Sequence, residues 1–209
     1  MSDSRTALLD QLVDAGRHVV ERGLVQASGG NLSVRVPGTD RFLVTGTGTW
    51  LDRLTHDDFA ELTPDGERVA GTERPSGEWR LHARTYAVRD DVAAIVHLHP
   101  QHVLLVDLLG APIRFTTLDH QYYLGSCGRV PFIPSGSEAL ADAAAEAARE
   151  HDAVVLAHHG CSALGDSVPM ALRRALNLEE AATMTYRLLV AGDTSADFPE
   201  EYCGRIIEV

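Results

Sequence analysis

Residues 95–100 read Ile-Val-His-Leu-His-Pro, an apolar run that ends in two histidines one residue apart. The run from Ala93 to His97 predicts a β-strand, and residues two apart in a strand point to the same face of the sheet. The imidazoles of His97 and His99 could therefore reach one ion. The stretch thus predicts a sheet strand with two candidate metal ligands at its end.

A second histidine pair follows another predicted strand. Residues 153–156 form a buried apolar run, and Ala157-His158-His159-Gly160 comes directly after it. One of these two histidines could complete a set of three imidazole ligands. Glu78, near the start of a predicted helix, adds a carboxylate. Three imidazoles with an open position and a carboxylate beside them describe a catalytic metal site, and they suit Zn²⁺ or another divalent transition metal.

The alternative interpretation of these residues needs no catalytic metal. Histidines often form hydrogen bonds in a core or lie at the surface, and a carboxylate at a helix start is favoured by the helix dipole. Five further histidines are expected to be structural or exposed, at positions 18, 56, 82, 102 and 151, and the role of His120 is left open. A structural metal site would need a fourth protein ligand, and chelation would unfold the protein.

The rest of the chain predicts helices mixed with hairpins. Helices are expected over 5–22, over 76–88 with Ser76 as N-cap, over 102–109, from a cap at Ser135 or Ser137 to about Glu150, and over 168–190. Strands are expected over 32–36 and 42–44 with a turn at 37–40, near 59–63 and 67–70, and over 130–133. Hairpins among helices predict an α/β sandwich around a mainly antiparallel sheet.

Length, charge and cysteine count narrow the function classes. A chain of 209 residues fits a single domain over 1–209. Lys and Arg number 18 against 30 Asp and Glu, a net charge of −12 that argues against nucleic acid or an anionic membrane surface as partner. Three widely spaced cysteines, no signal peptide and no apolar run of about 18 residues predict a cytoplasmic protein.

Three short loops rich in small and hydroxyl residues could bind a phosphate group. They are Ser28-Gly29-Gly30-Asn31-Leu32-Ser33, Thr45-Gly46-Thr47-Gly48-Thr49 and Ser76-Gly77. Glycines let backbone N–H groups approach an anion, and a helix N-terminus favours negative charge. Each loop alone is also what an ordinary turn looks like. Their occurrence beside a candidate metal site favours a small phosphorylated substrate.

Five stretches together resemble the class II aldolase/adducin family, and its L-fuculose-1-phosphate aldolase branch in particular. They are GGNLSVR at 29–35, LVTGTG at 43–48, PSGEWRLH at 75–82, IVHLHP at 95–100 and LAHHG at 156–160. They occur in the order and with the spacing of that family, and they span nearly the whole chain. The resemblance implies a three-layer sandwich with a central, mainly antiparallel sheet flanked by helices.

The resemblance also implies roles for individual residues. Metal ligands would be His97, His99 and His159, with Glu78 as a further ligand or as the acid/base, and the substrate phosphate would meet Asn31, Thr47, Gly48, Ser76 and Gly77. Gly77 stands where fuculose-phosphate aldolases usually carry a hydroxyl residue. A homotetramer with active sites between subunits is implied, and Tyr202 would be the catalytic tyrosine from the C-terminal tail. Segment 115–129 matches poorly, and Tyr122, Tyr123 and His120 stay open as its contribution.

The implied reaction is the cleavage of a ketose 1-phosphate to dihydroxyacetone phosphate and an aldehyde. It would pass through an enediolate stabilised by Zn²⁺ or another divalent metal, with Glu78 moving the proton. That role would need a raised pKa for Glu78 in the metal-free protein. On the same site, the alternatives are decarboxylation of a keto sugar-acid phosphate, sugar-phosphate epimerisation, or dehydration. A different class is a non-catalytic module like the adducin head.

Overall fold

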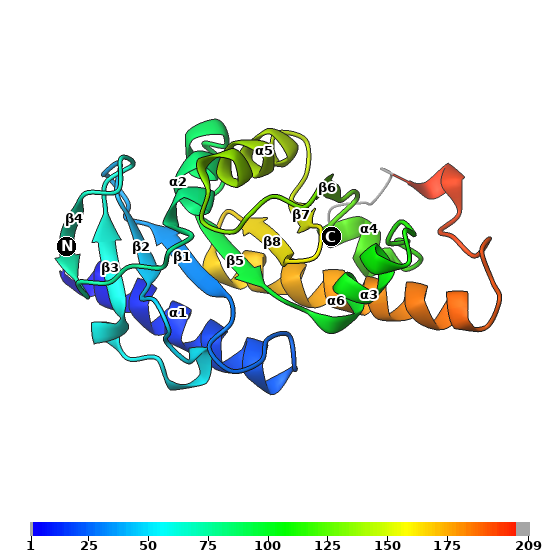
Figure 1. Ribbon diagram of the computed structural model, residues 1–209, viewed down its shortest axis with the longest axis horizontal. Coiled ribbons are helices and arrows are strands. Elements are labelled where there is room, and N and C mark those ends of the chain that lie inside the picture. Colours follow the sequence, from blue (N-terminus) through cyan, green and yellow to red (C-terminus); the bar gives the residue numbers. More distant parts are fainter. Residues whose placement is uncertain (1, 204–209) are drawn as a thin grey trace.

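One eight-stranded sheet runs through the computed structural model, which describes residues 2–203 (Figure 1). The strands are β1 (Asn31–Arg35), β2 (Phe42–Thr45), β3 (Phe59–Leu62), β4 (Arg68–Gly71), β5 (Ala94–Leu98), β6 (Gly128–Val130), β7 (Ala153–Leu156) and β8 (Gly160–Gly165). They lie in the order β4-β3-β2-β1-β5-β8-β7-β6. Every neighbouring pair is antiparallel except β6 and β7, which are parallel.

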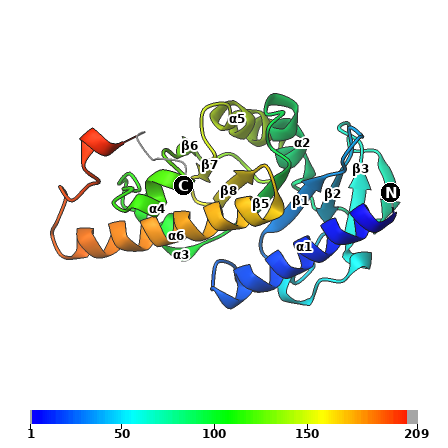
Figure 2. The ribbon, with the colours of Figure 1, turned by 180° about the vertical axis from the view of Figure 1, so that it is seen from behind.

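Helices cover both faces of this sheet. They are α1 (Ser2–Glu21), α2 (Trp79–Val88), α3 (Gln101–Leu108), α4 (Leu118–Tyr123), α5 (Glu138–Ala148) and α6 (Val168–Val190), with short 3-10 turns η1 (Leu51–Arg53), η2 (His56–Asp58) and η3 (Glu200–Tyr202). In Figures 1 and 2, α2 and α5 lie together on one face, and α1 and α6 lie on the other. The predicted α/β class, a mainly antiparallel sheet between layers of helices, is confirmed.

The central strand β5 shows why its residues before His97 are all apolar. Successive side chains of a strand point to opposite faces. Ile95 packs in the cluster formed with Leu81 of α2 and Leu140 of α5. Its neighbour Val96 packs in the cluster formed with α1 and α6 on the opposite face. Burying a side chain of this size contributes about 1.5–3 kcal/mol, so both faces hold β5 in place and fix where its final histidines lie.

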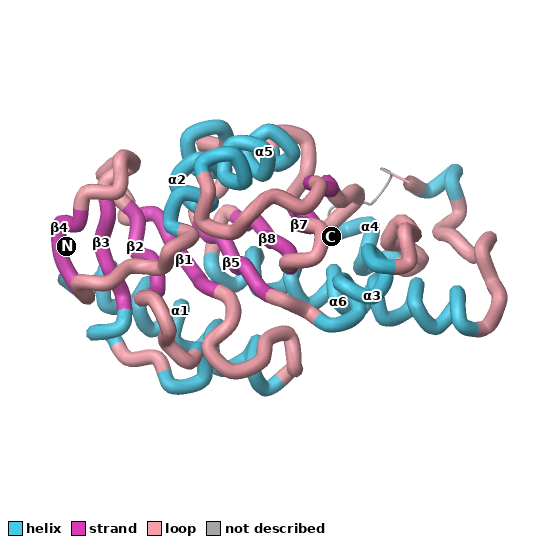
Figure 3. The backbone as a smooth tube through the Cα atoms, in the orientation of Figure 1, coloured by secondary structure: helices cyan, strands magenta, loops and turns pink. Residues whose placement is uncertain are grey.

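Most predicted elements are present, with small shifts at their ends (Figure 3). The hairpin of β1 and β2 and the hairpin of β3 and β4 are confirmed. The strand predicted over 130–133 is wrong in its bounds, because pairing with β7 ends at Val130 and Pro131 follows, which lacks a backbone donor. Of the two possible caps for α5, Ser137 is the one whose side chain accepts a hydrogen bond, from the backbone N–H of Leu140.

The predicted N-cap of α2 is wrong. The helix begins at Trp79, its N-cap is Glu78, and Ser76 lies in the turn before it. The hydroxyl of Ser76 accepts a hydrogen bond from the backbone N–H of Glu78 at 3.2 Å, two residues on. Ser76 therefore shapes the loop that presents Glu78, instead of starting the helix.

Among the α-helices and strands, two were not predicted, namely β8 and α4. Strand β8 reads Gly-Cys-Ser-Ala-Leu-Gly, with few residues of high β propensity. It is a strand because β5 and β7 pair with it on both sides.

Within residues 2–203, no helix is both long and apolar enough to cross a membrane. The predicted domain range of 1–209 extends past the described residues at both ends.

Candidate active site

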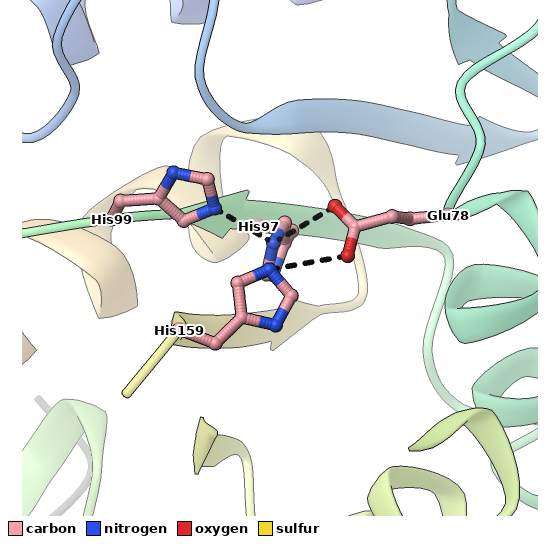
Figure 4. Close-up of side chains that lie close together, drawn as sticks. All are labelled: Glu78, His97, His99 and His159. Carbon is pink, nitrogen blue, oxygen red and sulfur yellow. Dashed lines mark hydrogen bonds and ion pairs between the residues drawn. The ribbon is translucent and has the colours of Figure 1, made fainter. Parts of the chain in front are cut away.

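Four side chains from three distant segments meet beside the end of β5 (Figure 4). His97 is in β5 and His99 follows it, His159 lies in the turn between β7 and β8, and Glu78 is the N-cap of α2. One potential ligand atom from each of the four lies within 4.8 Å of the others. The structure therefore brings together all four residues for which the sequence predicted metal binding.

The backbone around the cluster leaves no room for larger side chains. A Cβ atom on Gly160 would lie 2.2 Å from the carbonyl oxygen of Leu98 and 2.6 Å from the ring of His99. A Cβ atom on Gly30 would lie 2.7 Å from the carbonyl oxygen of His97, and this glycine also has a φ of +75°. These two glycines let β1 and β8 pass close to the histidine pair.

The turn that carries His159 is tight and separates the two histidines of the second pair. The backbone N–H of His159 bonds to the carbonyl of Leu156 at 3.0 Å, and His158 takes a φ of 60°. A non-glycine residue in this left-handed region is uncommon. The reversal directs His159 into the cluster, while the ring of His158 stacks edge-on with Phe132 at 6.1 Å between centroids.

Glu78 bridges two of the three histidines. Its carboxylate oxygens lie 3.3 Å from Nε2 of His97 and 3.2 Å from Nε2 of His159. Burial of this side chain would raise its pKa, but hydrogen bonds from His159 and His97 and the charges on both rings outweigh burial and hold the pKa of Glu78 far below its usual range. The raised pKa that we expected for the metal-free protein is therefore wrong, because that expectation left out the two imidazole donors.

The imidazoles are arranged to offer lone pairs. Burial, followed by the proximity of His97 and His159, lowers the pKa of His99 to about 4, so this ring is neutral at pH 7. The Nε2 atoms of His97 and His99 face each other at 3.3 Å. On its other side His97 contacts the hydroxyl of Ser162 in β8 through Nδ1, at 3.3 Å. A partner on Nδ1 of this kind fixes how a ligating ring is oriented.

The donor set fits a divalent transition metal. Three imidazole nitrogens and a carboxylate make a catalytic rather than a structural set, because three histidines leave a position for substrate when the carboxylate moves. A histidine whose Nε2 lone pair is shared with a cation cannot also donate a hydrogen bond from that atom. The bonds that lower the pKa of Glu78 therefore belong to the metal-free protein.

Two further residues hold the carboxylate of Glu78. The amide of Asn31 donates to one oxygen at 2.9 Å, and the hydroxyl of Ser135 donates to the other at 2.8 Å. Asn31 begins β1 directly opposite His97 in β5. Sequence reasoning placed Asn31 at the phosphate and considered Ser135 only as a helix cap. No local pattern around Ser135 signals its contact with Glu78, because the two residues are 57 positions apart.

The predicted phosphate loops lie side by side. Gly46 forms an isolated antiparallel β-bridge with Pro75, and the backbone N–H of Thr47 donates to the carbonyl of Arg74 at 2.8 Å. The Thr47 hydroxyl donates to the carbonyl of Pro75, so its hydrogen is already used. Within residues 2–203, the backbone N–H groups of Gly48 and Gly77 donate no hydrogen bond. These two groups and the hydroxyl hydrogen of Ser76 are therefore available to an anion.

Tyr202 is not gathered into this cluster in the single chain. It lies in η3, beyond the end of α6, and the residue is 58% exposed. Of the three open candidates in segment 115–129, His120 is fully buried against Glu180 of α6, Tyr122 is exposed on α4, and Tyr123 is partly buried against the core cluster that includes Phe115.

A chain of buried polar groups runs behind the cluster and was not predicted. His82, expected to be structural or exposed, is fully buried and contacts the side chains of Asn31 and Ser33. Burial, and to a smaller extent the charge of His97, lowers the pKa of His82 to about 3, so the ring is neutral. Ser33 also contacts the hydroxyl of Tyr86 at 2.7 Å.

Comparison with known proteins places this geometry in a family. Residues 10–186 match the model of the class II aldolase and adducin N-terminal domain. A 5-methylthioribulose-1-phosphate/5-deoxyribulose-1-phosphate aldolase of Rhodospirillum rubrum is 33% identical over 100% of this chain and 93% of its own length. An L-fuculose phosphate aldolase of Methanocaldococcus jannaschii is also 33% identical, over 84% of this chain and 93% of its own length.

Solved structures show the same similarity. YgbL of Klebsiella pneumoniae, described as a putative aldolase/epimerase/decarboxylase, superposes with a TM-score of 0.87 at 28% identity, over 97% of this chain and 99% of its own. L-fuculose-1-phosphate aldolase of Thermus thermophilus gives a TM-score of 0.80 at 31% identity, over 90% and 97%. The chain therefore belongs to the class II aldolase and adducin family, and it is an aldehyde-lyase of the fuculose-phosphate aldolase-like branch.

Proposed function

We propose that this protein is a metal-dependent aldolase that cleaves a ketose 1-phosphate to dihydroxyacetone phosphate and an aldehyde. One observation carries the proposal: His97, His99, His159 and Glu78 converge within 4.8 Å next to loops with free backbone donors. A site for a cation beside a site for an anion suits a substrate that carries both a carbonyl and a phosphate.

The four converging residues would hold the cation, and Zn²⁺ is the metal that we propose for them. When bound, such an ion supplies Lewis acidity, which stabilises negative charge on the substrate oxygen during cleavage of the carbon–carbon bond. Asn31 and Ser135 hold the two oxygens of Glu78 through the hydrogen bonds described above. Their part is to keep the carboxylate where it can act.

Glu78 is the residue that we assign to proton transfer. After cleavage, the dihydroxyacetone phosphate half of the substrate carries a negative charge at the carbon that was bonded to the aldehyde carbon, and it must gain a proton there. A carboxylic acid on Glu78 supplies that proton, and in the synthetic direction the carboxylate removes it. Its 13% side-chain exposure leaves it accessible from one side.

The phosphate group is proposed to bind between the two adjoining loops. The N–H groups of Gly48 and Gly77 and the hydroxyl of Ser76 have hydrogens to donate. Asn31 uses one amide hydrogen on Glu78 and has a second one. Thr47 would shape the loop that binds the phosphate. Its hydroxyl would bind the phosphate directly only if it gave up its hydrogen bond to the carbonyl of Pro75.

A homotetramer with active sites between subunits is proposed to complete the site. The support lies in exposed apolar side chains at the end of α3 and on α4, at Leu108, Leu109, Leu118 and Tyr122. Exposed apolar side chains that gather in one patch are typical of surfaces that contact another protein. Light scattering on the purified protein is expected to give four times the 22.6 kDa chain mass. Tyr202 would then handle the proton on the aldehyde oxygen in a neighbouring subunit, taking it from the hydroxyl as the aldehyde forms and returning it in the synthetic direction.

A cytoplasmic location is also part of the proposal. Cys127, Cys161 and Cys203 are all free thiols. Free cysteines without a disulfide are typical of reducing compartments.

Product analysis tests the proposed reaction. The relatives named above act on 5-methylthioribulose 1-phosphate, 5-deoxyribulose 1-phosphate or L-fuculose phosphate, so these three sugar phosphates are the first panel. We expect dihydroxyacetone phosphate and an aldehyde in equal amounts from at least one of them. Release of carbon dioxide from keto sugar-acid phosphates, with none of the three cleaved, would replace the aldolase by a decarboxylase, and an isomeric ketose as the product would indicate an epimerase.

A further inference from the structure

The hydrogen bonds between the buried polar side chains behind the cluster all run in one direction, from donor to acceptor. The NH₂ group of Asn31 donates a hydrogen bond to a carboxylate oxygen of Glu78 at 2.9 Å. The amide oxygen Oδ1 of Asn31 then faces Nε2 of His82. An amide oxygen can only accept, and therefore Nε2 of His82 must carry a hydrogen.

The same reasoning continues to the end of the chain. With a hydrogen on Nε2, the neutral ring of His82 has a lone pair on Nδ1, which lies 2.7 Å from the hydroxyl of Ser33. Ser33 must donate its hydrogen to that lone pair. Its oxygen then accepts from the hydroxyl of Tyr86, at 2.7 Å. Each group in the order Tyr86, Ser33, His82, Asn31, Glu78 donates to the next.

These hydrogen-bonded side chains lie where they can fix the orientation of Glu78. His82 and Tyr86 lie one turn apart on α2, the helix whose N-cap is Glu78. Ser33 and Asn31 lie two residues apart on β1, so both side chains point to the same face of the sheet. His82 and Ser33 are fully buried, where water cannot replace a lost partner. A buried polar chain of this kind holds one arrangement when every member is paired.

We propose that His82 is a positioning residue: by holding the Asn31 amide, it fixes the carboxylate of Glu78 at the metal cluster and aims the second amide hydrogen of Asn31 at the phosphate loops. Removing the contact between His82 and Asn31 leaves the amide free to rotate away from Glu78. This inference rests on the proposed metal role of the cluster, but its test does not require aldolase turnover.

A matched pair of substitutions isolates the contact. In His82→Gln the side-chain amide reaches the Nε2 position and can still donate to Asn31. In His82→Asn the amide ends at the Nδ1 position, so it can meet Ser33 but not Asn31. Both variants keep a polar amide in the same buried place. Thermal unfolding of both, without metal, establishes that each is folded at the titration temperature.

The readout is Zn²⁺ affinity of the metal-free protein, measured by calorimetric titration. Loss of a residue that orients a metal ligand typically weakens binding about 10- to 100-fold. We expect a loss in that range for His82→Asn and a loss of less than about threefold for His82→Gln. In an Asn31→Ala background, His82→Asn should weaken Zn²⁺ binding little further, because the two substitutions remove the same link. Equal losses in both His82 variants, or losses that multiply in the Asn31→Ala background, would overturn the proposal.

Nuclear magnetic resonance on the unsubstituted protein gives a second test if a variant does not fold. Histidine-labelled, metal-free protein should show the His82 ring as the Nε2–H tautomer, with the characteristic ¹⁵N shift of a lone pair on Nδ1. The Nδ1–H tautomer would reverse the chain and refute the proposal. If no sugar phosphate is cleaved, the proposed function fails, while the tautomer and the Zn²⁺ titrations still decide the role of His82.

Discussion

Two carboxylates in this protein each join elements that are far apart in sequence, but their partners differ in kind. Glu78 meets Nε2 of His97 and His159, and its side chain is 13% exposed. Asp152, which directly precedes β7, accepts a hydrogen bond from the guanidinium of Arg89 at 2.7 Å and forms an ion pair with Arg174 at 2.5 Å, and its side chain is 25% exposed. We refer to these as the histidine cluster and the arginine cluster.

The difference between the partners distinguishes a candidate metal site from a structural cluster. A guanidinium is always charged and has no lone pair to give to a cation. Arg89 also bonds to the carbonyl of Ala148 at the end of α5, and Arg174 bonds to the carbonyl of Leu164 in β8. The arginine cluster therefore ties helices to the sheet. Imidazoles can exchange a proton for a metal at neutral pH, so the histidine cluster can change state while the fold remains.

The largest expected effect is on turnover, from Glu78→Gln in the histidine cluster. Glutamine fills the same space but cannot accept and deliver a proton, and general acid–base groups typically contribute about 10²- to 10⁴-fold. We expect turnover to fall within that range, with Zn²⁺ still bound and the unfolding temperature little changed. Steady-state kinetics and metal analysis measure both quantities. Undiminished turnover would remove Glu78 from the mechanism.

The matched change in the arginine cluster is Asp152→Asn, and its expected effect is on stability. It removes the charge that two guanidinium groups share, and hydrogen bonds to charged groups contribute about 1.5–3 kcal/mol. We expect the free energy of unfolding, from urea titration, to fall by about that amount, while turnover per folded molecule stays close to that of the parent. A variant that is as stable as the parent but inactive would contradict the comparison.

The two clusters should also respond to acid in different pH ranges. His82, behind the histidine cluster, has a pKa lowered by burial to about 3, against 6.5 for an ordinary histidine. Below pH 6.5 the unfolded chain therefore binds a proton that the folded protein does not bind, so stability is lost as the pH falls from about 6.5 to 3, by up to about 1.4 kcal/mol per pH unit. In the arginine cluster, Arg89 also donates hydrogen bonds to Asp91 and lowers the pKa of Asp91 to about 2 from 3.8. The contribution of Asp91 to the stability of the folded protein is therefore lost only below about pH 3.8.

Urea titrations of metal-free protein between pH 7 and 3.5 measure this slope. The control is His82→Gln, which cannot be protonated and should give a flatter dependence between pH 6.5 and 4. An unchanged slope in that variant would show that other groups are responsible.

The smallest expected effect concerns the anion side of the histidine cluster, through Gly77→Ser. No atom lies within 4 Å of where a Cβ on Gly77 would be, so the side chain fits without strain. One added neutral hydrogen bond contributes about 0.5–1.5 kcal/mol. We expect inorganic phosphate to inhibit at a concentration about two- to tenfold lower, with the unfolding temperature unchanged. Weaker inhibition by phosphate would place the anion elsewhere.

Local sequence patterns predicted one part of the site well. The alternation that puts His97 and His99 on one face depends only on strand geometry, and the hairpin of β1 and β2 follows from alternating apolar residues. These signals come from neighbouring residues, so a single sequence contains them. The choice of His159 over His158 came from the family resemblance, and the left-handed backbone at His158 gives its physical basis.

Contacts between distant segments could not be predicted in this way. Ser135 and Glu78 meet because α5 packs on α2, and His82 faces inward because β1 covers it. Strand β8 has no propensity signal and exists through its two neighbours. The pKa of Glu78 was expected to be raised because a role in proton transfer would need that, whereas the imidazole donors of His97 and His159 lower it.

The central claim is that the histidine cluster is the metal centre of an aldolase. The most direct test is a coupled assay for dihydroxyacetone phosphate with purified protein and a ketose 1-phosphate that it cleaves, before chelation, after chelation and after readdition of Zn²⁺, with circular dichroism recorded at each stage. We predict that release stops on chelation while the fold persists, and that Zn²⁺ restores it. Release that continues in metal-free protein, or a fold that is lost together with the metal, would contradict the account.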